Sequence, residues 1–486
     1  MPISATEGAG PTYAVLREEL EARLGLRVCR PELWDLSQTE GWQIDLPGLA
    51  ASERAATPDE QRRALQLWST FPQYLQTDTD NLRAGLAAGY SAPKPIVARV
   101  IKQVDGLLAA APEDSPFYAP AKRAHDAEFA KALRTLIVEQ ITPAIRKYAD
   151  FLRTEYMPGA RESLGVSALP NGAACYQAYL RRYTTTDETP QFVFDSGQKI
   201  VSESTTAIRS IGSRLYHTTN LSEIVRRSHD DPKNRFRSGG ELLDFSREMV
   251  EHSEQKCRAL FLQMPSQPVV VKPLPEYQRG SGVPNHYEAN PNDREPATFW
   301  ISTDDWATET RGAAQITAVH ETVPGHHLQI ATARRLQKPS NLSKLICNAA
   351  YAEGWANYAE RLAEEQSIDD DDYERVQRRV LAGRSLVIDP GIHVFGWTRA
   401  QAEGYAMEAG MSKAQTDDVI DRIAVEPGQL TSYEVGGLEI SSLREEARKR
   451  LGAKFDLREF HQRVLEQGAI PLSALREHVM AWAGRH

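Results

Sequence analysis

The stretch "AVHETVPGHHLQ", from Ala318 to Gln329, decides how the rest of the chain is interpreted. It begins like the helical metal-binding pattern His-Glu-x-x-His, but Pro324 occupies the position of the second histidine. A proline inside a helix lacks the N–H that would bond to the carbonyl four residues earlier, and its ring presses on that carbonyl. The helix is therefore predicted to be irregular within the motif.

Two histidines follow the proline, and either could be a second metal ligand beside His320. A catalytic zinc takes three protein ligands and keeps one position open for water. His327 is close to two full turns from His320, but a regular helix would separate the pair by about 10 Å of rise. That is a long span for two imidazoles bound at about 2.1 Å. A bulge that absorbs two extra residues would favour His326, which we expect to bind while His327 points elsewhere; His327 as ligand remains the alternative.

A second predicted helix, residues 343–366, carries Glu353 on a stripe of small and apolar residues. A carboxylate there is costly unless it is paired or bound to a metal. An ion pair with an arginine elsewhere would satisfy it, and so would a role as third zinc ligand. A His-Glu helix followed some 33 residues later by a helical glutamate is the layout of glutamate-type zinc peptidases. Glu321 would then be the general base that activates water.

The composition is ordinary for a soluble globular protein, since 25% of the 486 residues are charged and 41% are hydrophobic. A formal net charge of −9 argues against a surface for nucleic acid or an anionic membrane. No run reaches the roughly 18 apolar residues of a membrane span, and residues 1–28 lack the pattern of a signal peptide. The cysteines form no CxxC pair, which predicts reduced thiols in a cytoplasmic protein. They are Cys29, Cys175, Cys257 and Cys347.

Helical periodicity dominates the chain and predicts a mainly α fold. Residues 126–158 are expected to form a long helix with a kink at Pro143. Two short runs rich in β-branched and aromatic residues, "QPVVVKPLPEY" and "REPATFWIST", predict strands separated by a loop. They indicate a small sheet beside the metal-binding helix, and the second strand could offer a free edge to an extended peptide. We expect an N-terminal helical lobe, residues 1–265, and a metal-binding lobe, residues 266–486.

The motif His-Glu-x-x-Pro-Gly-His-His-Leu-Gln, together with Glu-Gly-Trp-Ala-x-Tyr-Ala-Glu, resembles the bacterial domain-of-unknown-function family number 885. The stretches "LWDLSQTEGWQ", "YLRRYTTTDETPQFVFDSG", "VIDPGIHVFGWT" and "VEPGQLTSYEVGGLEISSLR" agree, so the resemblance spans nearly the whole chain. It implies a helical zinc-peptidase (gluzincin) fold with a deep cleft, similar to angiotensin-converting enzyme and thermostable carboxypeptidases. The shared Gly-His before the apolar turn aligns His326 with the second zinc histidine of those enzymes.

Other residues could assist at such a centre. His393, after a Pro-Gly turn, and Tyr433, between glycine-bearing turns, match family motifs and suit oxyanion or leaving-group roles. A capping histidine and a packed tyrosine would fit these positions equally well. Arg444 could grip a substrate carboxylate as a bidentate fork, or it could be a surface arginine of a helix. Tyr287, in the loop before the second strand, is expected near the cleft, where it and His327 would contact the substrate.

These features together predict a cytoplasmic hydrolase that cleaves an amide bond in a short peptide or peptide-like metabolite. One zinc per chain would be held by His320, His326 and Glu353. One alternative is a biosynthetic enzyme that uses the same metal site for another reaction, and a second is a binding protein with a vestigial site. A decayed site would have lost Glu321 or a ligand, whereas all four positions are present. The sequence does not indicate which bond is cleaved or how many subunits the protein has.

Overall fold

The chain folds mainly into helices, with one small sheet, as the sequence predicts. The structure, a computed structural model, describes residues 10–275, 285–290, 292, 294–335, 348–368 and 371–485. Cys347, predicted to be a reduced thiol, lies outside the described residues, and so does the beginning of the helix predicted from residue 343.

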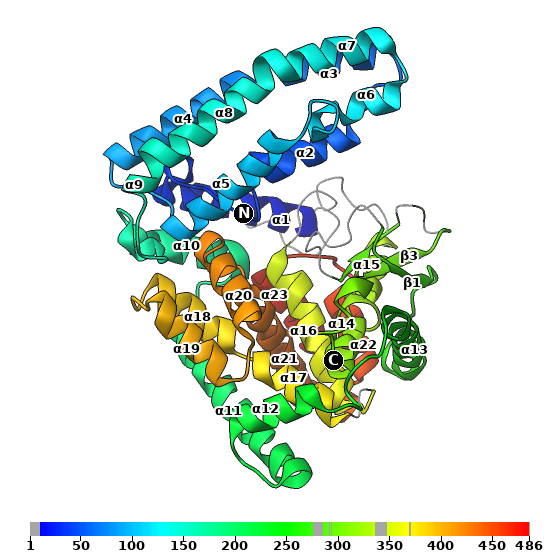
Figure 1. The fold of residues 1–486 in the computed structure, drawn as a ribbon. Coiled ribbons are helices and arrows are strands. Elements are labelled where there is room, and N and C mark those ends of the chain that lie inside the picture. The colour runs from blue at the N-terminus through cyan, green and yellow to red at the C-terminus, as the bar shows by residue number, and fades with distance from the viewer. Residues whose placement is uncertain are drawn as a thin grey trace.

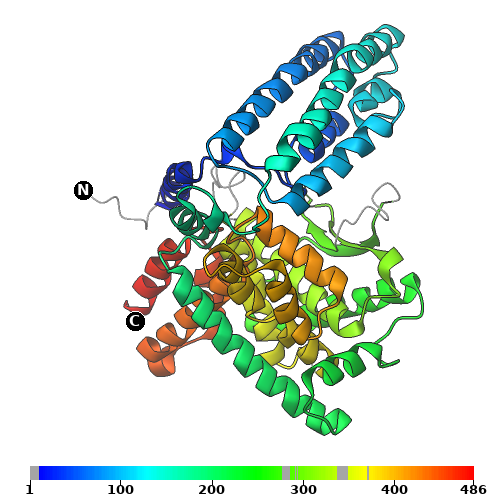
Figure 2. The same ribbon diagram turned by 60° about the vertical axis from the view of Figure 1, so that its left-hand side comes forward.

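A bundle of helices projects from the rest of the molecule (Figure 1). Aromatic side chains fill its interior, where Trp42 packs edge-on against Phe71 and Tyr148, with ring centroids 5.5 and 5.3 Å apart. Figure 2 shows the same bundle standing away from the remaining helices after the turn of the view. Its members are α2 (Trp42–Ser52), α3 (Pro58–Ser69), α4 (Phe71–Ala87), α5 (Lys94–Ala109), α6 (Ala119–Ala124), α7 (Ala127–Leu136), α8 (Thr142–Phe151) and α9 (Met157–Gly159).

The long helix predicted over residues 126–158 lies within this bundle. Helical turns continue from α7 through α9, but π-helical turns occupy Ile137–Ile141 and Leu152–Tyr156. Pro143 follows the first of these turns. Because proline has no N–H to donate, a local widening of the helix accommodates it. The irregularity predicted at Pro143 is therefore a π-helical turn.

The remaining helices form the body of the molecule, at one end of the bundle (Figure 1). Helix α11 packs along α18, and α13 packs along α14, so helices from both sides of residue 265 pack together. The predicted lobes, residues 1–265 and 266–486, stay a prediction. The helices of the body are α1 (Gly10–Leu26), α10 (Gly172–Thr184), α11 (Pro190–Tyr216), α12 (Leu221–Asp230), α13 (Gly239–Cys257), α14 (Arg311–Glu321), α15 (His326–Arg334), α16 (Ala349–Glu365), α17 (Asp372–Leu381), α18 (Arg384–His393), α19 (Arg399–Glu408), α20 (Lys413–Val425), α21 (Thr431–Leu451), α22 (Leu457–Leu465) and α23 (Leu472–Ala483).

A three-stranded sheet packs against α14. Strand β1 (Val269–Pro273) runs parallel to β3 (Ala297–Ile301), and β2 (His286–Glu288) pairs antiparallel with the other side of β3. Phe299 of β3 and Ala318 of α14 belong to one apolar cluster. Both predicted strands are present. The sequence did not predict β2, which lies in the stretch predicted as a loop, because three residues are too few to show an alternating pattern. Since β3 is the central strand and both of its edges are paired, the prediction of a free edge there is wrong.

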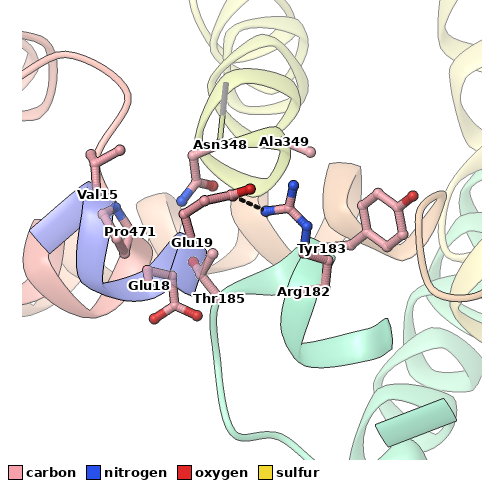
Figure 3. Close-up of a pocket in the computed structure, with 9 residues that line it drawn as sticks. All are labelled: Val15, Glu18, Glu19, Arg182, Tyr183, Thr185, Asn348, Ala349 and Pro471. Atoms are coloured by element: carbon pink, nitrogen blue, oxygen red, sulfur yellow. Dashed lines mark hydrogen bonds and ion pairs between the residues drawn. The ribbon is translucent and has the colours of Figure 1, made fainter. Parts of the chain in front are cut away.

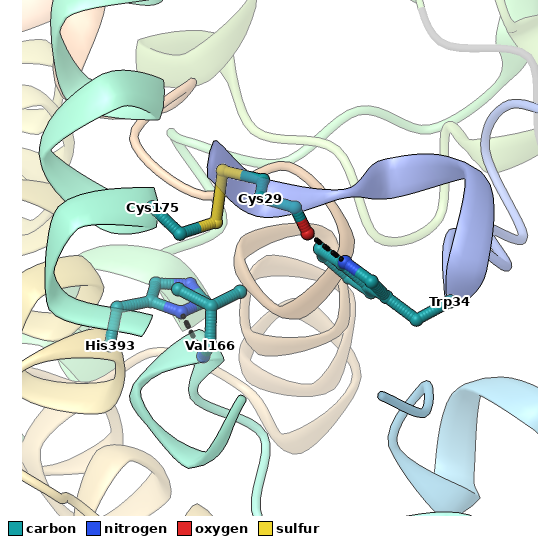
Figure 4. The surroundings of a disulfide bond; sticks show 5 residues. All are labelled: Cys29, Trp34, Val166, Cys175 and His393. Atoms are coloured by element: carbon teal, nitrogen blue, oxygen red, sulfur yellow. Dashed lines mark hydrogen bonds between the residues drawn. A yellow bond between two sulfur atoms is a disulfide. The ribbon is translucent and has the colours of Figure 1, made fainter. Parts of the chain in front are cut away.

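Cys29 and Cys175 form a disulfide, with Cα atoms 4.7 Å apart (Figure 4). The prediction of reduced thiols is therefore wrong for this pair. Cys29 ends a short 3-10 turn, and Cys175 lies in the first half of α10. Trp34 donates a hydrogen bond from Nε1 to the carbonyl oxygen of Cys29 over 2.8 Å. The two cysteines are 146 residues apart in the sequence, so no local pattern indicates that they meet.

Candidate metal centre

The motif helix is broken where the sequence predicts an irregularity. Helix α14 ends at Glu321, and α15 begins at His326 after a segment that contains the cis Val323–Pro324 peptide. Gly325 is required in this break, because a Cβ atom there would lie 1.9 Å from the carbonyl oxygen of His320. Trp355 of α16 donates from Nε1 to the carbonyl oxygen of Pro324 over 2.8 Å, which holds the break against the next helix.

His320, His326 and Glu353 come together at this break. Their ligand atoms all lie within 4.8 Å of one another. The Nε2 atoms of His320 and His326 are each 3.5 Å from the same oxygen, Oε2 of Glu353. Two ligands bound tetrahedrally at about 2.1 Å are separated by about 3.4 Å, so the three side chains fit one zinc ion. His326, and not His327, joins this cluster.

Neighbouring side chains orient both histidine rings. His320 donates from Nδ1 to Oε1 of Glu360 over 2.8 Å, and His326 donates from Nδ1 to Oε1 of Gln329 over 3.2 Å. Each ring thereby turns its Nε2 atom toward Glu353, which is how the partners of a metal ligand orient its ring. The sequence reasoning missed Glu360 and Gln329. Sequence spacing could have indicated both, because Glu360 follows Glu353 by seven residues and Gln329 follows His326 by three. Residues at these spacings lie on the same face of a helix.

In the cluster, the positive charge of the His320 imidazolium and the negative charge of the Glu353 carboxylate stabilise each other. Burial lowers the pKa of His320, but hydrogen bonds to Glu353 and Glu360 outweigh it and raise this pKa to about 10. Burial raises the pKa of Glu353, but hydrogen bonds to His320 and His326 outweigh it and lower this pKa to about 2. A protonated imidazole thus lies between two carboxylates when no metal is bound.

Glu321 and His327 are both tied to strand β2 through Tyr287. The Tyr287 N–H donates to Oε2 of Glu321 over 3.0 Å, so Tyr287 lies beside the candidate base, and its predicted contact with substrate stays a prediction. Its hydroxyl donates to Nδ1 of His327 over 3.0 Å, and His327 donates from Nε2 to the carbonyl oxygen of Gln267 over 2.9 Å. His327 is 2% exposed, and burial lowers its pKa to about 4. The expectation that His327 contacts substrate is therefore corrected, because one ring nitrogen is bonded to Tyr287 of β2 and the other to Gln267, which precedes β1.

Tyr433 reaches the cluster from α21. Its ring stacks near that of His320, with centroids 6.3 Å apart and an interplanar angle of 22°. The close crossing of α16 and α21 makes this possible, because a Cβ atom at Gly436 would lie 1.9 Å from the carbonyl oxygen of Ala350. Burial raises the pKa of Tyr433 to about 12, so its hydroxyl keeps its hydrogen at neutral pH. The structure therefore places the Tyr433 ring beside His320, and the predicted oxyanion or leaving-group role of Tyr433 stays a prediction.

His393 does not join the cluster. It accepts a hydrogen bond at Nδ1 from the Val166 N–H over 3.1 Å (Figure 4). Its Nε2 donates to the carbonyl oxygen of Ile423 over 2.9 Å. The ring is fully buried, and burial lowers its pKa to about 3. The predicted catalytic role of His393 is corrected to a structural one, because no ring atom is left for a substrate.

His393 and Asp389 together hold the corner between α20 and α21, residues 426–430. Asp389 accepts hydrogen bonds from the Gly428 N–H over 3.0 Å and from the Tyr176 hydroxyl over 2.7 Å. Because Tyr433 follows this corner directly, these bonds fix the position from which its ring approaches the cluster. The motif around His393 and the motif before Tyr433 therefore contact each other through these hydrogen bonds.

Arg444 also lies away from the cluster. Its Nη2 donates to Oε2 of Glu365 over 2.6 Å, and its Nη1 donates to the Tyr358 hydroxyl over 3.2 Å. The side chain is 11% exposed. The predicted grip on a substrate carboxylate is therefore corrected, because this guanidinium is neutralised within the fold.

A small cavity opens at the beginning of α16, the helix that carries Glu353. It has a volume of about 60 Å³. The Glu19–Arg182 ion pair crosses it, and Asn348, which caps α16, lies at its wall (Figure 3). None of its lining residues belongs to the metal cluster. The predicted deep cleft therefore stays a prediction.

Two solved structures have folds similar to this chain. A "putative lipoprotein" from Colwellia psychrerythraea gives a TM-score of 0.84 at 25% sequence identity, with 93% of this chain and 81% of that chain covered. A "putative lipoprotein of unknown function" from Shewanella oneidensis gives a TM-score of 0.75 at 19% identity, with 98% and 94% covered. A search of curated proteins finds no match. Within the described residues, each helix is too short or too polar to cross a membrane.

One family matches residues 4–479, which include the whole cluster and both of its motif helices. The match extends over almost the entire chain, so it reflects common descent of the whole fold and not a shared motif alone. The chain therefore belongs to the family described as bacterial protein of unknown function, DUF885.

Proposed function

We propose that this protein is a zinc-dependent hydrolase that cleaves an amide bond in a short peptide or peptide-like metabolite. The observation that carries the proposal is the convergence of His320, His326 and Glu353, with Glu321 next to His320. Two imidazoles and one carboxylate are a ligand set of catalytic zinc sites. A His-Glu helix that meets a glutamate helix also supports the gluzincin-type fold implied by the family resemblance.

A zinc ion held there would polarise the substrate carbonyl and make water more acidic. The side chains of this protein would supply the proton transfers. Glu321 is held at Oε2 by the Tyr287 N–H, which leaves Oε1 to accept a proton and pass it to the leaving amine. Tyr433 could donate its hydroxyl hydrogen to the carbonyl oxygen as negative charge develops on it.

Elemental analysis of protein purified without added metal tests the proposal most directly. We expect one zinc per chain, together with turnover of at least one member of a panel of dipeptides and N-acyl amino acids. Protein that contains no zinc and takes none up on addition would sink the metallohydrolase proposal. Zinc without any amide hydrolysis would favour the alternative of another metal-dependent reaction at the same residues.

The disulfide bears on the compartment in which the protein works. Disulfides persist in oxidising compartments and are rare in the cytosol, so the Cys29–Cys175 bond weighs against the cytoplasmic location predicted from the sequence. The lipoprotein names of the two similar structures agree with an oxidising compartment. Alkylation of protein from freshly lysed cells, before and after reduction, tests this. Two further modified cysteines after reduction are expected, and an equal count would restore the cytoplasmic prediction.

A further inference from the structure

Helix α1 exposes a stripe of large apolar side chains. They are Tyr13, Leu16, Leu20 and Leu24, which are 47%, 39%, 52% and 63% exposed. Spacings of three and four residues place them on one face of the helix. Among the described residues, no other helix exposes more than two large apolar side chains. Single exposed apolar residues are normal on a soluble protein, whereas an apolar stripe along a helix marks an interaction site.

The opposite face of α1 is already packed. Val15 is buried there, and α1 contacts α10 along its length. Two ion pairs fasten the helices together, because Arg181 donates to Glu18 over 2.9 Å and Arg182 donates to Glu19 over 2.5 Å. In Figure 2, α1 lies at the left-hand edge of the molecule. A helix that is apolar on two opposite faces is built to pack on both, so the outer stripe calls for a second partner.

The charged residues of α1 favour a protein partner over a membrane. The helix carries three glutamates and two arginines, whereas helices that lie on membranes are rich in lysine and arginine. Arg17 and Glu21 follow one flank of the stripe and form an exposed ion pair over 2.7 Å. A flank with one charge of each sign, one helical turn apart, is complementary to a second copy of itself that runs in the opposite direction.

We infer that two copies of this chain associate through α1, with the two helices antiparallel, a pairing that is independent of the proposed hydrolase function. A two-fold axis that passes near residues 18 and 19 brings Leu16 of one copy to Leu20 of the other. The same axis brings Tyr13 to Leu24 at each end of the contact. A two-fold interface uses the same surface on both copies, so one stripe is sufficient to form it.

The charges give this pairing its direction. With the same two-fold axis, Arg17 of each copy lies near Glu21 of the other, so the two ion pairs of the separate helices can be exchanged between them. A helix of 17 residues is only about 25 Å long. The contact is therefore short, and the dissociation constant of the dimer is expected to be on the order of micromolar.

Sedimentation of the full-length protein between about 1 and 100 µM tests the pairing, because a micromolar dimer assembles across this range. Leu20→Glu places a charge at the centre of the contact and should raise the dissociation constant about tenfold or more. Leu381→Glu is the matched control, since Leu381 of α17 is 48% exposed and lies outside the stripe. It should leave association unchanged. Melting temperatures of both variants show that each remains folded.

Reversal of the charges tests the antiparallel direction without touching the apolar stripe. Arg17→Glu should weaken the dimer, because the second copy then presents Glu21 to a like charge. Adding Glu21→Arg to the same chain should restore association, since opposite charges meet again. A dissociation constant that ignores Arg17→Glu, or that does not recover in the double variant, would overturn the antiparallel pairing.

Two further results would overturn the dimer itself. One is a monomer at every concentration, and the other is an association that survives Leu20→Glu. The protein is also sedimented with vesicles of phosphatidylethanolamine and phosphatidylglycerol. No binding is expected, and binding that is lost in Leu20→Glu would show that a lipid surface covers the stripe in place of a second copy.

Discussion

The Nδ1 atom of His320 and the Oε1 atom of Glu360 are 2.8 Å apart, and this hydrogen bond fixes which ring nitrogen faces the cluster. Because Nδ1 donates to Glu360, Nε2 is the nitrogen that faces Glu353 and that offers its lone pair to a metal once its proton has been displaced. Glu360 lies two turns after Glu353 on α16, so one helix supplies both a candidate ligand and the carboxylate that orients another.

Zinc affinity should increase with pH. Burial lowers the pKa of His320, but the hydrogen bonds to Glu353 and Glu360 outweigh burial and raise this pKa to about 10 in the metal-free protein. The ring is therefore protonated at neutral pH. Zinc must displace that proton, and each displaced proton strengthens apparent binding about tenfold per pH unit below the pKa. Competition titrations with a chelator between about pH 6 and pH 8 measure the slope. A flat profile would show that His320 is neutral before the metal arrives.

Glu360→Gln should weaken zinc binding by about 10–100-fold, as loss of an orienting partner typically does, and should flatten the pH profile. The flattening follows because the amide no longer stabilises the imidazolium of His320. Glu365→Gln is the matched control, since its carboxylate lies on the same helix but pairs with Arg444. Equal profiles for both variants would argue that the hydrogen bond between His320 and Glu360 has no part in metal binding.

Glu321→Gln should keep zinc and lose turnover, because the amide cannot accept a proton from water. Glu353→Gln should lower the zinc content as well, since it removes the anionic ligand. Elemental analysis and a peptide hydrolysis assay on the same preparations separate the two effects. If both variants retained zinc and activity, the assignment of base and ligand would be wrong.

The two adjacent histidines should behave differently. His326→Ala should strip the zinc, whereas His327→Ala should keep most of it and lose thermal stability, because the link between Tyr287 and the carbonyl of Gln267 disappears. Zinc content and melting temperature are measured for each. The reverse pattern of zinc content would favour the two-turn geometry in which His327 is the ligand.

The α16–α21 crossing should not tolerate a methyl group. Gly436→Ala places a Cβ atom 1.9 Å from the carbonyl oxygen of Ala350, so the helices must separate. We expect a loss of about 1–3 kcal/mol in the free energy of unfolding, as is typical of overpacking, and weaker zinc binding without any change of ligand. Gly404→Ala, in the exposed face of α19 with no atom within 4 Å, should instead stabilise the protein by roughly 0.5–1 kcal/mol. Equal melting temperatures for the two variants would contradict this account.

Local sequence patterns were sufficient to predict a mainly helical fold and the convergence of His320, His326 and Glu353. The break at Pro324 follows from the chemistry of proline, and the place of Glu353 follows from a helical stripe of small residues. Tyr433 could be selected by its motif, although its stacking near His320 depends on the crossing at Gly436.

What the sequence could not indicate depends on contacts between distant segments. His393 and Arg444 looked suitable for catalysis, but their partners Val166 and Glu365 are set by tertiary packing. The pairing of Cys29 with Cys175 has the same origin, since 146 residues separate them.

The position of that disulfide has a topological consequence. Helices α2–α9, the whole projecting bundle, lie between Cys29 and Cys175, so the bond closes this part of the chain into a covalent ring. A single protease cut anywhere in the bundle would open the ring and yet release no fragment until the bond is reduced. The bundle could likewise lose its fold while both of its ends remain fastened to the body that carries the metal cluster.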